Sequence, residues 1–174
     1  MKIISKEQIE QVYGQMNAVS PEEAAKTVEF VKARQPQAFE YLVSAGAQQD
    51  FTREEAQWLS YIGVILCRIL VEAEPASPAI TRECIDQCAA RITDLVRYLK
   101  GSDKDDFVKV IAAMLKDYPQ PHLLNFVVSV IRTGQEEKAG ITPKNASVFF
   151  FFFKILMDAF IQTREGQEHQ SAQE

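Results

Sequence analysis

Residues 142–164, TPKNASVFFFFFKILMDAFIQTR, decide the fold class of this protein. Thr142 and Pro143 form a helix start, because threonine caps the first turn and proline fits the first helical position. The residues that follow are apolar on nearly every side of a helix, and such a helix must be enclosed by other parts of the protein. Residues 52–73, TREEAQWLSYIGVILCRILVEA, have the same character. We therefore predict two central helices surrounded by amphipathic ones.

The rest of the chain has the spacing of amphipathic helices, with apolar residues recurring every three or four positions. Capping sequences begin these segments, as in Ser20-Pro21-Glu22-Glu23, and glycines such as Gly46 follow their ends. No segment alternates apolar and polar residues as a half-buried strand does. We predict an all-α fold of about eight helices, near residues 5–18, 20–34, 37–46, 52–73, 80–100, 103–117, 121–133 and 142–164.

The sequence carries an internal repeat. Residues 4–11 align with residues 80–87, and four of the eight aligned positions are identical. Two further matches follow in the same order along the chain, which a chance similarity between short helices does not explain. They place Pro36, Tyr41, Val43 and Ser44 on Pro121, Phe126, Val128 and Ser129, and then Thr52, Ala56, Ile65 and Leu66 on Thr142, Ala146, Ile155 and Leu156.

This repeat predicts two tandem four-helix units, residues 1–76 and 77–164, followed by a flexible tail at 165–174. Each unit supplies one central apolar helix that it cannot bury alone, so we expect the two units to share one joint core with pseudo-two-fold symmetry. The alignment places Arg68 on Asp158. We expect these two charges to pair in or beside the core, because a lone buried charge is costly. The alternative places both on the surface without contact.

The five consecutive phenylalanines from Phe149 to Phe153 cover every side of a helix and admit three interpretations. The first is the joint core. The second is an exposed aromatic patch that forms an interface with a partner or a second copy. The third is an apolar pocket between the phenylalanines and Trp58, with inward polar groups from the same central helices. The candidate interface or ligand residues are Trp58, Tyr61, Arg68, Phe149, Phe150, Phe153 and Asp158.

The distribution of charged residues and the N-terminal residues indicate which partners and which cellular compartment to expect. The chain has 24 acidic and 19 basic residues, a formal charge of −5, and no cluster of lysine and arginine. Nucleic acid and an anionic membrane surface are therefore poor partners. Residues 148–161, the longest apolar stretch, include Lys154 and Asp158 and are shorter than a membrane span requires. Charge at Lys6 argues against a signal peptide, and three cysteines do not build a disulfide framework, so we expect the cytoplasm.

No motif in the sequence assigns a reaction. Glycine-rich phosphate loops, nucleophile elbows and paired metal-binding histidines are absent, and Cys84 and Cys88 share a helix face with apolar residues. We expect no catalytic residues, no metal and no cofactor. The favoured function is a non-enzymatic interaction or regulatory protein that recognises a protein partner or itself through helix faces. The alternatives are a binder of an apolar small molecule and an enzyme built around a buried charged residue.

Overall fold

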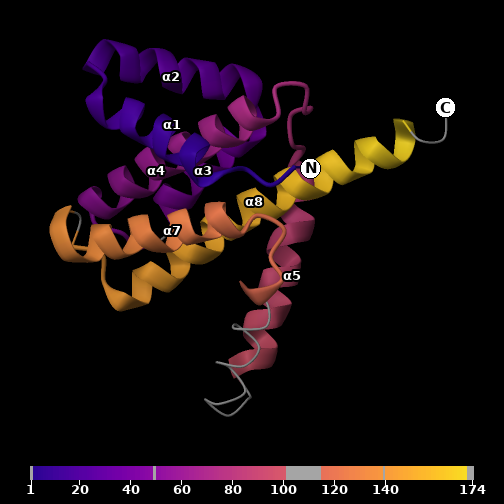
Figure 1. Ribbon diagram of the computed structural model, residues 1–174. Coiled ribbons are helices and arrows are strands. Elements are labelled where there is room, and N and C mark those ends of the chain that lie inside the picture. The colour runs from indigo at the N-terminus through magenta and orange to yellow at the C-terminus, as the bar shows by residue number, and fades with distance from the viewer. Residues whose placement is uncertain (1, 49, 101–114, 139, 172–174) are drawn as a thin grey trace.

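The computed structural model describes residues 2–48, 50–100, 115–138 and 140–171, and over these residues the protein contains helices and no strands (Figure 1). Seven of the eight predicted helices are present. The predicted helix at 103–117 lies almost entirely outside the described residues. The α-helices are α1 (Lys6–Ala18), α2 (Pro21–Arg34), α3 (Pro36–Gln48), α4 (Arg53–Ala73), α5 (Arg82–Lys100), α7 (Pro121–Thr133) and α8 (Pro143–Ser171), and a π-helix, η1 (Gly134–Lys138), follows α7.

Capping side chains fix where three of these helices begin. Ser5, Ser20 and Thr52 each accept a hydrogen bond from the backbone N–H three residues later. The side chain of that later residue in turn accepts a hydrogen bond from the backbone N–H of the cap. Such a reciprocal pair satisfies two backbone donors that the first turn leaves open. The predicted starts of α2 and α4 are confirmed.

The helices α4 and α8 are central, as predicted. The side chains of Leu59, Ile62, Ile65 and Leu66 on α4 are fully buried. On α8 the stretch 153–157 is buried without interruption. Figure 1 shows α8 as the long helix that runs beneath α1–α4, and it contacts α4, α5 and α7 along its length. The amphipathic helices pack around this pair and complete one continuous core.

Helix α8 continues to Ser171, so its predicted end near residue 164 is too early. Glutamate and glutamine are good helix formers, and the segment contains no proline that would end the helix. The single Gly166 lowers helix propensity by only about 1 kcal/mol, which the neighbouring residues offset.

Two buried glutamines tie the halves of the chain together. Gln35, just before α3, accepts a hydrogen bond from the N–H of Ile80 at 2.9 Å and donates to the Pro78 carbonyl at 3.4 Å. Gln120, just before α7, accepts from the N–H of Ile4 at 2.9 Å. Its amide also donates to the carbonyl of Lys2 at 2.9 Å. Each glutamine thus fixes the segment that leads into the first helix of the other half. We call these contacts the glutamine clasps.

Candidate functional site

The first candidate site is an apolar groove between α7 and α8, which we call the α7–α8 groove. It encloses about 450 Å³, and the described residues that line it are Val128, Ile131, Arg132, Gln135, Ala146, Ser147, Phe150 and Phe151. The side chain of Val128 is 47% exposed. Phe150 and Phe151 are half-buried and form its wall on α8. Contiguous exposed apolar surface is a common feature of binding sites.

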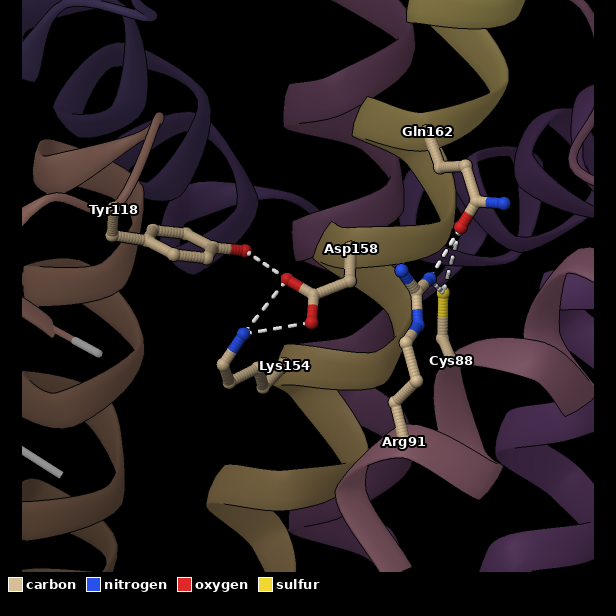
Figure 2. Close-up of polar contacts among 6 residues, drawn as sticks. All are labelled: Cys88, Arg91, Tyr118, Lys154, Asp158 and Gln162. Atoms are coloured by element: carbon tan, nitrogen blue, oxygen red, sulfur yellow. Dashed lines mark hydrogen bonds and ion pairs between the residues drawn. The ribbon is translucent and has the colours of Figure 1, made fainter. Parts of the chain in front are cut away.

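The second candidate site is a pocket between α5 and α8, which we call the α5–α8 pocket (Figure 2). It encloses about 360 Å³ and is lined by Arg91, Ile92, Leu95, Tyr118, Pro119, Lys154, Asp158, Ile161, Gln162 and Glu165. The Lys154 side chain is only 6% exposed, and its Nζ lies 2.7 Å from Oδ2 of Asp158. Tyr118 donates its hydroxyl to Oδ1 of Asp158 at 2.8 Å. The Lys154 ammonium also lies 4.7 Å from the centre of the Tyr118 ring.

Arg91 reaches the same pocket from α5 (Figure 2). Its guanidinium donates to the side-chain oxygen of Gln162 and to Sγ of Cys88, the latter at 3.1 Å. Both acceptors are neutral. Among the described residues Arg91 has no carboxylate partner, whereas the buried Lys154 has one.

Burial controls the protonation of the groups around this pocket. It raises the pKa of Tyr118 far above its ordinary value, and the neighbouring Asp158 carboxylate adds to the effect. Burial likewise raises the pKa of the Cys88 thiol, although Arg91 opposes the change. Tyr118 therefore acts as a hydrogen-bond donor at neutral pH, and Cys88 stays a thiol, which is a weak nucleophile. This arrangement suits binding better than acid–base or thiol chemistry.

The phenylalanine run divides between the core and the surface. Phe149 and Phe153 are fully buried, as the core interpretation predicts. Phe150 lies at the α7–α8 groove, in line with the interface interpretation. One helix presents both environments because five consecutive residues span more than a full turn.

The predicted ion pair between Arg68 and Asp158 is wrong. Arg68 instead pairs with Glu72 on its own helix, at 2.6 Å. It also donates to Thr27 and Gln15, at 3.3 Å each, and so ties α4 to α1 and α2. Asp158 takes its counter-charge from Lys154, one turn earlier on α8. Local pairs at this spacing need no tertiary alignment, and each charge is satisfied within its own half.

Trp58 and Tyr61 do not line the α7–α8 groove. The Trp58 ring lies against Gly134 and Ile141, with its centre 6.1 Å from that of Tyr61. Tyr61 donates its hydroxyl to Asn17 at 2.9 Å. It also lines a smaller apolar pocket of about 230 Å³ between α2, α3 and α4. The apolar pocket expected between Trp58 and the phenylalanines is thus replaced by two separate apolar sites.

Sequence reasoning missed most residues of the α5–α8 pocket, among them Lys154, Tyr118 and Arg91. A signal existed for the first, because Lys154 and Asp158 are opposite charges four residues apart inside an apolar helix. Tyr118 and Arg91 gave no such signal, since their contribution depends on how the turn before α7 and the helix α5 approach α8.

No cluster of three metal-ligating side chains occurs within the described ranges. The three cysteines are free, and Cys67 and Cys88 are buried in the core. Burial raises the pKa of the Cys67 thiol to about 12, so it stays protonated and packs as a small apolar group.

By length and composition alone, α4 and most of α8 are apolar enough to cross a membrane. In this fold 56% of the α4 stretch and 50% of the α8 stretch are buried, and core helices commonly have this composition.

Comparison with known proteins does not assign a function to these sites, because no family model, curated relative or solved structure matches the chain.

Proposed function

We propose that this protein is a non-enzymatic interaction protein of the cytoplasm that recognises a second copy of itself through the α7–α8 groove. The observation that carries the proposal is the exposed Val128 beside the half-buried Phe150 and Phe151, in a groove of about 450 Å³. Closing this groove against a second copy would remove apolar surface from water, which contributes roughly 25 cal/mol per Å².

Charges beside the groove support a second copy as the occupant. Arg132 lines the groove, and Glu136 follows it on η1. Both are exposed, and neither has an ion-pair partner within the described part of the chain. Two-fold symmetry brings the same patch of both copies together. It therefore allows Arg132 of each copy to form an ion pair with Glu136 of the other copy, so that opposite charges face each other across the interface.

We further propose that the chain consists of two tandem helical repeats related by pseudo-two-fold symmetry. The glutamine clasps support this, because the sequence repeat aligns their partners. Gln35 and Gln120 each precede an aligned proline, and Ile4 and Ile80 are aligned with each other. Each glutamine binds the aligned residue of the other half. A reciprocal contact of this kind is what a two-fold relation between repeats produces.

The proposed repeat also aligns helices that line the two apolar sites. Val43 on α3 aligns with Val128 on α7. In the first half, α2 covers the face between α3 and α4, where Ala24 and Val28 line the small pocket beside Val43. The described residues that line the α7–α8 groove all belong to α7, η1 and α8.

Self-association is tested by native mass spectrometry and sedimentation equilibrium across a concentration series. We expect a dimer, and we expect Val128→Glu to abolish it by placing an unpaired charge in the groove. Val43→Glu is the matched control, because Val43 is 55% exposed on the aligned helix. It should leave the dimer intact. A monomer at every concentration, or equal effects of both substitutions, would contradict the proposal.

A charge exchange tests the orientation of the two copies. Arg132→Glu alone and Glu136→Arg alone should each weaken the dimer, because each places like charges together. The double variant should restore it. A photo-crosslinking residue at position 128 should join two copies. Crosslinks only within one chain, or only to a different protein, would show that the groove has another occupant.

The small pocket beside Tyr61 supports a second candidate function, the binding of a small apolar molecule. Its walls are formed by residues such as Met16, Phe39 and Leu42, and its volume of about 230 Å³ suits a single aromatic ring. Dry apolar cavities of similar size take up benzene. Toluene should shift the NMR signals of these residues, and Ala24→Phe should remove the effect by filling the space.

A further inference from the structure

The α5–α8 pocket combines an apolar wall with charges of both signs. Ile92, Leu95 and Ile161 supply apolar surface, and the charged side chains that face the space are Arg91, Lys154, Asp158 and Glu165. A volume of about 360 Å³ falls at the lower end of the roughly 300–1,000 Å³ found for small-molecule sites. This site is separate from the α7–α8 groove and does not depend on the proposed self-association.

Two of the four charges compensate each other. Lys154 binds both oxygens of Asp158, at 2.9 and 2.7 Å, and Tyr118 donates a third hydrogen bond to the same carboxylate. This cluster is electrically neutral and lies largely out of solvent. Helix α8 can hold it because residues four apart share a face.

The other two charges remain available to a ligand. Among the residues that the structure describes, the acceptors of Arg91 are the neutral Gln162 and Cys88. Glu165 is exposed and has no ion-pair partner among the residues described. Both line the pocket, yet they do not pair with each other. Within the described part of the chain, the pocket therefore presents one unpaired cation and one unpaired anion, held on different helices, together with apolar surface.

We propose that the α5–α8 pocket binds a small zwitterion with an apolar body, of the class of the apolar α-amino acids. The ligand's carboxylate takes the place of the Gln162 amide oxygen on Arg91, because a carboxylate accepts two parallel hydrogen bonds from a guanidinium. Its ammonium group meets Glu165, and its side chain lies against Ile92, Leu95 and Ile161.

Gln162 can release Arg91 without losing all its contacts. Its amide nitrogen already donates to the side-chain oxygen of Gln87 at 3.2 Å. When a ligand carboxylate occupies Arg91, the Gln162 oxygen is free to accept from the ligand's ammonium group or from water. The exchange therefore replaces a neutral acceptor with a charged one, which strengthens the hydrogen bond.

Isothermal titration calorimetry with L-leucine and two truncated analogues tests the proposal on the full chain. 3-Methylbutylamine lacks the carboxylate, and 4-methylpentanoate lacks the amine. We expect L-leucine to bind with a dissociation constant on the order of 1 mM or tighter. Each analogue should bind about tenfold to a hundredfold more weakly, because each loses one charge-assisted contact.

Substitutions test which residue binds the carboxylate of the ligand and which binds its ammonium group. Arg91→Gln should weaken the binding of L-leucine by about the same factor as removal of the ligand's carboxylate. Glu165→Gln should weaken it by about the same factor as removal of the ligand's amine. Arg97→Gln and Glu54→Gln are the controls, because both residues are exposed and neither lines the pocket. Circular dichroism checks that every variant is folded.

Three results would overturn the proposal. The first is the absence of binding heat with L-leucine at concentrations of about ten times the expected dissociation constant. The second is equal binding of 4-methylpentanoate and L-leucine, which would indicate an anion site without recognition of the amine. The third is binding that the control variants weaken as much as Arg91→Gln does.

Discussion

Several buried polar side chains of this protein hold backbone groups that would otherwise lack hydrogen bonds. Glu55, which is 1% exposed, is the most connected of them. Its carboxylate accepts from the N–H groups of Thr52 and Thr142, at 3.0 and 3.2 Å. It also accepts from the side-chain amide of Asn145 at 2.9 Å. One carboxylate thus caps α4 and joins its first turn to that of α8.

The protonation of Glu55 links these contacts to pH. Burial by itself raises the pKa of this carboxyl, but the hydrogen bonds from Thr52, Asn145 and Thr142 outweigh burial and lower the pKa below the ordinary 4.5. The unfolded state therefore binds the proton more readily. The stability that Glu55 contributes is fully present above about pH 4.5 and is lost as the pH falls through the lower value of the folded state.

We predict that Glu55→Gln lowers the free energy of unfolding by about 2–3 kcal/mol at neutral pH, because an amide cannot accept from all three donors. Urea unfolding at pH 7 and at pH 3 measures this. The gap between wild type and variant should narrow at the lower pH. The exposed neighbour Glu54 serves as the control, and Glu54→Gln should cost under about 1 kcal/mol. If wild type and Glu55→Gln differed in free energy of unfolding by the same amount at both pH values, the contribution of Glu55 would not depend on its ionisation.

At the scale of elements, the fold depends on how closely α3 approaches α4. Gly63 lies in the middle of α4, and a Cβ there would come within 2.4 Å of Cδ2 of Leu42 on α3. Leu42 is itself only 1% exposed. A side chain at position 63 would therefore force Leu42 to shift, so glycine favours the close packing although it lowers the helix propensity of α4.

We predict that Gly63→Ala lowers stability by about 1–3 kcal/mol, since overpacking outweighs the gain of about 1 kcal/mol in helix propensity. Gly14→Ala on α1 is the matched control, because nothing lies within 4 Å of a Cβ at that position. It should raise stability by about 0.5–1 kcal/mol. Thermal unfolding followed by circular dichroism compares the two. A stabilising Gly63→Ala would show that the α3–α4 contact is looser than the structure has it.

At the scale of the whole molecule, the glutamine clasps connect the two halves at positions far apart in the sequence. Gln35 and Gln120 are 2% and 1% exposed. Each accepts a hydrogen bond from a backbone N–H of the other half. Removing either side chain leaves that donor buried and unpaired, which costs free energy.

We predict that Gln35→Ala and Gln120→Ala each lower the free energy of unfolding by about 1–3 kcal/mol, and by similar amounts if the halves are repeats. Gln57→Ala, at an exposed position on α4, should change it by less than about 0.5 kcal/mol. Urea unfolding measures all three. Widely different costs for the two clasps would weigh against the duplication.

The sequence by itself determined some features of this protein and left others open. It determined the helical class, seven of the described helices and the central place of α4 and α8, because apolar spacing and capping residues act over a few neighbouring positions. It did not determine which charges pair. Arg68 and Asp158 occupy aligned positions in the proposed repeat, but each pairs with a residue one turn away on its own helix.

Only the tertiary structure decided which phenylalanines are buried and which side chains share a pocket. Phe149 and Phe150 are neighbours in sequence, yet one lies in the core and the other at the α7–α8 groove. Likewise, Arg91 joins Lys154 and Asp158 only because α5 packs on α8. The local pattern of apolar and capping residues determines where each helix forms and which of its faces are apolar. Which faces are covered depends on the packing of several helices at once, and no single segment encodes it.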